Sequence, residues 1–164
     1  MPLGRRFRST AVAAALGLLA ACGFHLQGHG PLPESVRTPY LEAPDKQSDF
    51  AVSLRHALLS NGAHLAQEKD KASAIVSIRK DQVERRTLVV SPTNQPDAYE
   101  LIYTVGFEVT SGDKELLPLQ EVSLTRTYSF NESLLLAKGH EEDVLREDMA
   151  KQLADLVMRR LSRL

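Results

Sequence analysis

Cysteine is scarce in this chain, and Cys22 is the one cysteine among 164 residues. A single cysteine cannot close an internal disulfide, so the folded part must be held together by its core. The 143 residues that follow residue 21 fit one domain. A domain of that size buries roughly two thirds of its unfolded surface, which is enough without a cross-link. Long apolar runs are also lacking after residue 21, so the sequence predicts no membrane-spanning helix.

Catalytic motifs are missing as well. The sequence has no Gly-rich phosphate loop, no Cys/His cluster with metal-ligand spacing, no G-x-S-x-G and no H-E-x-x-H. His25 and His29 have the four-residue spacing of a helical metal pair, but glycines and a proline around them disfavour a helix. We therefore expect no enzymatic activity, no metal site and no cofactor.

The first residues carry a clear pattern. Arg5, Arg6 and Arg8 precede an apolar run from Ala11 to Ala21. That run has the length of the apolar part of a secretory signal and is too short to span a bilayer. The pattern predicts a signal peptide over residues 1–21 that is removed from the mature protein.

The signal ends in Leu19-Ala20-Ala21-Cys22, which resembles the lipobox of bacterial lipoproteins. In those proteins the cysteine thiol receives a diacylglyceryl group, the chain is cut before the cysteine, and the new amino terminus is acylated. The resemblance implies a covalent, palmitate-type lipid on Cys22, whereas a plain signal peptide with a chance cysteine is the alternative. Three acyl chains exceed the two signals that stable anchoring requires. Gly23 stands where an aspartate commonly retains Gram-negative lipoproteins at the inner membrane, so the resemblance points to the outer membrane.

The charge balance limits the kinds of partner. Without the three signal-peptide arginines the chain has 17 Lys and Arg against 21 Asp and Glu, a net charge of −4. An acidic chain is not suited to binding polyanions in general, so no nucleic-acid partner is expected. An anionic ligand would have to be held by a local cluster of cations.

The mature chain begins with a segment that has little periodicity. Residues 22–34 contain several glycines and prolines, and we interpret them as a tether that reaches roughly 40 Å when extended at about 3.3 Å per residue. Residues 35–164 form the single expected domain. Its first predicted strand, Val36–Ala43, contains Pro39, and a proline inside a strand indicates an edge position.

The middle of the chain alternates between helical and extended patterns. Residues 49–60 have helical spacing, and Asn61-Gly62 is a typical helix stop. Residues 73–90 predict one long strand whose apolar residues change phase, so we expect a bulge near Arg79–Gln82. The composition of residues 91–97 predicts a loop.

The last third of the chain gives the clearest elements. Residues 99–110 alternate strictly as a half-buried strand, residues 111–114 predict a turn, and residues 122–130 predict another strand. Arg126 occupies the apolar register of that strand, which is typical of a long side chain at the margin of a sheet. We expect a break at Gly139 and a long amphipathic helix over residues 141–164. The order β-α-β-β-β-α predicts an α+β fold, a two-layer sandwich of two helices on one face of a four-stranded, mostly antiparallel sheet.

Basic residues gather near the expected strand ends. They are Arg79, Lys80, Arg85, Arg86, Arg126 and Lys138. Such a set could grip phosphates through charge-assisted hydrogen bonds. Charges of this kind also keep a sheet edge from pairing with other chains, and that interpretation remains open.

Three stretches together resemble the LptE family, the lipoprotein subunit of the outer-membrane lipopolysaccharide translocon. They are Cys22-Gly23-Phe24-His25-Leu26, Ala98-Tyr99-Glu100-Leu101, and Arg126-Thr127-Tyr128-Ser129-Phe130-Asn131 with Leu136-Ala137-Lys138. The resemblance implies two helices on a four-stranded sheet. It implies a role as a plug inside the large β-barrel partner LptD, as a 1:1 heterodimer, assisting barrel assembly and the delivery of lipopolysaccharide to the outer leaflet.

The resemblance also implies a binding site. The lysine of the family's Leu-Ala-Lys motif corresponds to Lys138, and a second family arginine lies in the loop before Ala-x-Tyr. That loop, residues 91–97, contains no basic residue here, so Arg85 and Arg86 are the nearest candidates, with Arg126 as a further one. The competing hypothesis is an accessory, periplasm-facing lipoprotein of another envelope transport machine that binds a protein partner only.

Overall fold

The computed structural model describes residues 32–92, 95–129 and 135–164, with the side chains of the last range from residue 141 onward. The elements follow the order η1 (Glu34–Val36), β1 (Pro39–Glu42), α2 (Asp49–Ser60), η2 (Lys69–Lys71), β2 (Ala74–Val90), β3 (Pro96–Ser111), β4 (Lys114–Ser129) and α3 (Leu135–Leu161). The expected order of strands and helices is confirmed.

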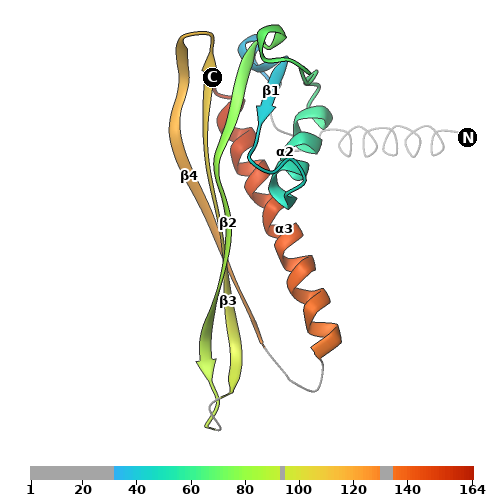
Figure 1. Ribbon diagram of the computed structural model, residues 1–164, viewed down its shortest axis with the longest axis vertical. Coiled ribbons are helices and arrows are strands. Elements are labelled where there is room, and N and C mark those ends of the chain that lie inside the picture. The colour runs from blue at the N-terminus through green and yellow to red at the C-terminus, as the bar shows by residue number, and fades with distance from the viewer. Residues whose placement is uncertain (1–31, 93–94, 130–134) are drawn as a thin grey trace, which may run out of the picture.

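The four strands form one mixed sheet in the order β1-β2-β3-β4. β1 pairs with β2 in parallel, and β2, β3 and β4 pair as an antiparallel meander. β1 lies at an edge, as Pro39 predicted. Proline has no backbone N–H to donate to a neighbouring strand, so it is tolerated at an edge and not in the centre of a sheet. Both helices cover the same face of the sheet (Figure 1), so the predicted two-layer α+β fold is confirmed.

Local chemistry sets the bounds of α2. The Ser48 side chain caps its first turn by accepting a hydrogen bond from the Ala51 amide, which satisfies an otherwise unpaired donor. At its other end the Asn61 amide donates to carbonyls of the last turn, and Gly62 has a φ of 83°. Glycine enters this left-handed region without the steric cost that other residues bear. The predicted stop is therefore confirmed.

The core lies between the helices and the sheet. α2 contributes Phe50, Leu54 and Leu58, and the facing rows of β2 and β3 bury their alternate apolar residues. α3 adds a buried stripe at helical spacing, made of Met149, Ala150, Leu153, Ala154, Val157, Met158 and Leu161. At roughly 25 cal/mol per Å² of apolar surface, this burial is the main force that holds the layers together.

A bulge divides β2. The register with β3 shifts between Ile78 and Lys80, so Arg79 is the extra residue and the predicted bulge is confirmed. Opposite it lies Gly106, where an added Cβ atom would stand 3.0 Å from the Cβ of Lys80. β3 passes close to the bulge of β2 at this point, so glycine, which has no Cβ atom, fits there without a steric clash.

Several predicted boundaries are wrong. The first strand begins at Pro39 and not at Val36, which belongs to η1. α3 begins at Leu135 and runs through Gly139 without the expected break, because an interior glycine costs only about 1 kcal/mol relative to alanine. β4 begins at Lys114 rather than near residue 122, since its outer edge tolerates Pro118. The loop predicted over residues 91–97 is shorter, because β3 already begins at Pro96.

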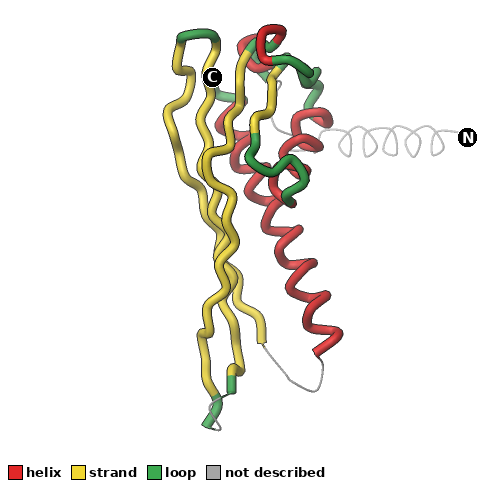
Figure 2. Tube along the Cα trace, viewed as in Figure 1, coloured by secondary structure: helices red, strands yellow, loops and turns green. Residues whose placement is uncertain are grey.

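The second face of the sheet is polar and faces away from both helices (Figure 1). It presents, among others, Glu84 and Arg86 of β2, Thr104 of β3, and Ser123, Thr125, Thr127 and Ser129 of β4. We call this surface the polar face. The β2–β3 hairpin extends beyond the first turn of α3 (Figure 2). A strand of 17 residues such as β2 spans about 55 Å at 3.3 Å per residue.

Candidate functional site

Five of the six basic residues singled out in the sequence have described side chains. Arg79 and Lys80 lie in the interior of β2 at the bulge, so the expectation that the cations mark strand ends is wrong for them. Lys138 lies in the first turns of α3, and its side chain is outside the described residues, as is all of Cys22.

Arg85 points to the helix side of the sheet. Its Nη1 atom lies 3.1 Å from Oε2 of Glu142 on α3, and its guanidinium carbon lies 5.0 Å from the centre of the Tyr99 ring. The Tyr128 hydroxyl donates to the same Glu142 oxygen, and the rings of Tyr99 and Tyr128 are 5.7 Å apart. We call Arg85, Tyr99, Tyr128 and Glu142 the aromatic-acid cluster. It joins β2, β3 and β4 to the beginning of α3.

The cluster shifts the ionisation of its members. Burial by itself would raise the pKa of Glu142, but the hydrogen bonds from Tyr128 and Arg85 outweigh it and hold that pKa below its ordinary value. Burial, and then the hydrogen bond to Glu142, raise the pKa of Tyr128 to about 12. The hydrogen bond to Glu142 raises the pKa of Arg85. Glu142 is therefore a carboxylate and Tyr128 a neutral phenol at neutral pH.

Arg86 lies on the polar face. Its Nε and Nη2 atoms contact the two carboxylate oxygens of Glu84 at 2.7 and 2.9 Å, a bidentate arrangement within one strand. The hydrogen bonds with Glu84 raise the pKa of Arg86 and those with Arg86 lower the pKa of Glu84. The Arg86 side chain is 58% exposed. A guanidinium has five N–H donors, so Glu84 does not use its full capacity.

Arg126 is on the helix side, opposite the face of Arg86. Its Nη2 donates to Oε1 of Gln152 on α3 at 2.7 Å, and Gln152 in turn donates to Asp148. Arg126 and Arg85 both pair with Leu101 of β3 in the register of the sheet, so two strand spacings, about 10 Å, separate them. The structure thus brings Arg85 and Arg126 into one row under α3, whereas Arg86 faces away from them.

The remaining cations of β2 are also paired. Arg79 contacts Glu108 through Nε and Nη2 at 2.8 and 2.6 Å, and Lys80 lies 3.3 Å from Glu121. An exposed ion pair contributes only about 0–1 kcal/mol. A phosphate could therefore replace a carboxylate at such a cation at little cost.

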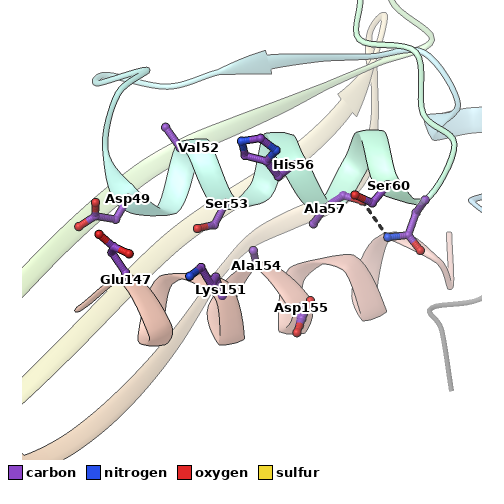
Figure 3. A pocket seen from close by; sticks show the side chains of 11 residues that line it. Asp49, Val52, Ser53, His56, Ala57, Ser60, Glu147, Lys151, Ala154 and Asp155 are labelled. Atoms are coloured by element: carbon purple, nitrogen blue, oxygen red, sulfur yellow. Dashed lines mark hydrogen bonds between the residues drawn. The ribbon is translucent and has the colours of Figure 1, made fainter. Parts of the chain in front are cut away.

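Two hollows lie outside the basic set, and no local pattern in the sequence predicts either of them. The larger, about 660 Å³, is a groove between α2 and α3. Figure 3 shows Ser53 and His56 of α2 above Glu147 and Lys151 of α3 along this groove. Its floor includes the small residues Ala57 and Ala154, while its rim carries charges of both signs. The small side chains of Ala57 and Ala154 leave space between α2 and α3, so the groove is a result of how these two helices pack.

The second hollow, about 410 Å³, lies where the chain leaves β1 and turns toward α2. Its lining includes Pro44 and Ser48 of that connection, Asp81 and Val83 of β2, and Tyr103 of β3. The Ser48 hydroxyl donates to Asp81, and burial raises the pKa of Tyr103. No group of His, Cys, Asp or Glu that could hold a metal occurs among the described residues, and within them no helix has the length and apolarity to cross a membrane.

A family model described as LptE, lipopolysaccharide-assembly, matches residues 36–161. The chain belongs to the LptE family. LPS-assembly lipoprotein LptE of Pectobacterium atrosepticum is 25% identical over 158 residues, which cover 95% of this chain and 85% of that one. The LptE match spans every described strand and α2 in full, and α3 to its last residue.

Solved structures of lipoproteins share this fold. Lipoprotein B of Nitrosomonas europaea has a TM-score of 0.70 and 30% identity, covering 85% of this chain and 90% of that one. Rare lipoprotein B of Shewanella oneidensis has a TM-score of 0.67 and 26% identity, covering 77% and 94%. Both are similar to this chain through nearly their whole length.

Proposed function

We propose that this LptE-family chain is a non-enzymatic lipoprotein that assists lipopolysaccharide assembly from within a large outer-membrane β-barrel. The match of the family model over residues 36–161 carries the proposal, together with the similarity to the LPS-assembly lipoprotein LptE of Pectobacterium atrosepticum. Cys22 would hold the lipid anchor, and the barrel partner is an LptD-type protein in a 1:1 complex.

The dimensions of the sheet support the position inside a barrel. β2 has 17 residues and spans about 55 Å, which exceeds the 40–45 Å of a whole bilayer with its headgroups. The polar face offers hydroxyl and charged side chains along this length, such as Ser123, Thr125 and Thr127. The lumen of a large barrel is polar, so such a face can form hydrogen bonds with it.

The proposed lipopolysaccharide contact lies at the end of the domain remote from the tether. η1 and the start of β1 lie at one end, while the end of β2 and the start of α3 lie at the other (Figure 1). Arg86 and Lys138 belong to that second end. The point where the tether joins the domain and a ligand bound at the second end would be separated by about the length of the sheet.

Purification from detergent-solubilised outer membranes tests the plug role. We expect a large barrel protein to be recovered with the tagged chain in a 1:1 ratio. If the chain is recovered without a stoichiometric barrel protein, the plug role is wrong. Recovery of a periplasmic protein in place of the barrel would support the alternative, an accessory lipoprotein of another transport machine.

Binding of purified lipopolysaccharide tests the second part of the proposal. Lys138→Glu and Arg86→Glu should each weaken binding because they replace a cation by a charge that repels phosphate. Arg79→Glu is the matched control, since Arg79 is paired in the same way but lies at the bulge. Equal affinity of all three variants and the native chain would reject Lys138 and Arg86 as contacts.

A further inference from the structure

Among the residues that the structure describes, no strand lies beside the outer edge of β2 over most of its length. β1 pairs with Ala74–Ser77, and in the described part of the chain no strand continues that pairing. From Lys80 to Thr87 the strand keeps an unbroken register with β3. We call the outer side of residues 80–90 the open edge. In an antiparallel strand every second residue directs its N–H and C=O to the outer side, so the open edge presents a row of backbone donors and acceptors.

The same stretch exposes aliphatic side chains. Val83 is 40% exposed, and Leu88, Val89 and Val90 are 51%, 47% and 53% exposed. The 410 Å³ hollow borders the start of the open edge at Asp81 and Val83. The connection from β1 to α2 approaches β2 at this point, since the Ser48 hydroxyl donates to Asp81, but in the described chain it forms no strand beside β2 beyond Glu42.

The other edge of the sheet provides an internal comparison. The outer side of β4 is regular from Gln120 to Ser129, yet the exposed side chains of that stretch are polar: Glu121, Ser123, Thr125, Thr127 and Ser129. Backbone groups occur at both edges. Just before this stretch β4 exposes Leu119, whereas β2 exposes Val83 and the run Leu88, Val89 and Val90. A strand that adds to a sheet gains main-chain hydrogen bonds from the edge and selectivity from the side chains beside it.

We propose that the open edge binds an extended segment of a partner protein, which adds to the sheet as a further strand beside residues 80–90 of β2. The segment would place mixed charges beside Lys80–Arg86 and apolar residues beside Leu88–Val90. This inference rests on the proposed function for the identity of the partner, the barrel protein. The wall strands of a closed barrel are paired on both sides, so the donor is an extended loop or arm of the barrel protein.

A second copy of the chain fits the open edge less well. Two-fold symmetry would pair the open edges of two copies antiparallel. If the whole segment 80–90 is paired, Leu88–Val90 of each copy then lies beside Lys80–Gln82 of the other. Aliphatic side chains would then face charged and polar ones. A partner of different sequence avoids this mismatch, because it can offer apolar residues at one end and charges at the other.

Residue-resolved hydrogen exchange on the purified complex with the barrel protein tests this assignment. Relative to the isolated chain, alternate amides of residues 80–90 should exchange about fivefold more slowly, the factor that one hydrogen bond of typical net strength supplies. The outward amides of residues 120–129 are the control and should change less. If the barrel is recovered and residues 80–90 exchange as in the isolated chain, the strand addition is wrong. If no barrel is recovered, the proposed function fails at that earlier step and this inference fails with it.

Proline substitutions provide the matched variants. Neighbouring residues direct their N–H groups to opposite edges, so one of Gln82→Pro and Val83→Pro removes an outward donor and leaves the ladder with β3 intact. The variant that retains the native melting temperature should bind the barrel about fivefold more weakly. Ser123→Pro and Leu124→Pro form the equivalent pair on β4. Because Ser123 belongs to the polar face, their folded member is compared with the alanine variant of the same residue and should bind as that variant does. Native binding by the folded β2 variant would overturn the proposal. A second result would also overturn it. If lipopolysaccharide added to the isolated chain slows exchange at every amide of residues 80–90, and not at alternate amides, then the stretch contacts hydrocarbon and does not pair with a strand.

Discussion

The Tyr128 hydroxyl donates a hydrogen bond to the Glu142 carboxylate and so joins the last strand of the sheet to the first half of α3. Arg85 of β2 reaches the same carboxylate from the opposite side of β3. One side chain of α3 is therefore held by two strands that are not neighbours. The beginning of α3, where Lys138 lies, depends on this contact for its position over the sheet.

Removal of the Tyr128–Glu142 contact should destabilise the domain. We expect Tyr128→Phe to lower the free energy of unfolding by about 1–2 kcal/mol, because a hydrogen bond to a charged group is lost and Glu142 is partly buried. Denaturant titration measures the change. The double variant with Glu142→Gln should cost less than the two single costs together. Full additivity would contradict an energetic coupling between the two side chains.

The low pKa of Glu142 gives the stability an acid dependence. The folded pKa lies below the unfolded one, so this contribution is fully present above the unfolded pKa of about 4.3 and is lost as the pH falls through the folded pKa. The melting temperature of the native chain should therefore fall more steeply below about pH 4 than that of Glu142→Gln. Parallel profiles for the two proteins would show that Glu142 contributes nothing to this dependence.

Gly106→Ala should strain the bulge of β2. The added methyl group meets the Cβ of Lys80 at 3.0 Å, and overpacking of this kind costs about 1–3 kcal/mol. Thermal unfolding measures the loss. Lys80→Gly removes the opposing atom, so in that background the same substitution should cost less. An equal cost in both backgrounds would assign the effect of Gly106→Ala to backbone conformation and not to this contact.

Glu84 should compete with phosphate for Arg86. Glu84 accepts hydrogen bonds from two nitrogens of the Arg86 guanidinium, and Glu84→Gln weakens that pairing. The affinity for lipopolysaccharide should then increase about two- to fivefold, because an exposed ion pair contributes about 0.5–1 kcal/mol. Glu108→Gln releases Arg79 in the same way and is the control. A gain for both variants would indicate a general charge effect.

Cys22→Ser tests the anchor. We expect the variant to lose incorporation of labelled palmitate and to move from the membrane fraction to the soluble periplasmic fraction, because the acyl chains provide the proposed attachment. Its folded domain should melt as the native domain does. Continued membrane association without palmitate labelling would mean that another part of the protein, or its partner, holds it there.

Much of the fold follows from short-range patterns. The alternation of residues 99–110, the phase change near Arg79 and the proline at position 39 predicted a long strand, a bulge and an edge strand, and the structure confirms each. The predicted boundaries fail where one element continues through an unfavourable residue. Pro118 lies within β4 and Gly139 within α3, because neighbouring pairing and packing outweigh local preference.

The sequence by itself determined the anchor motif, the order of the elements and which side of each strand faces the helices, because these depend on residues close together in the chain. Only the tertiary structure decided what each cation contacts. Arg85 and Glu142 are 57 residues apart, and Arg126 and Gln152 are 26 apart, so no local pattern records either contact. The parallel pairing of β1 with β2, and the open edge that remains where it ends, likewise arise from packing between distant segments.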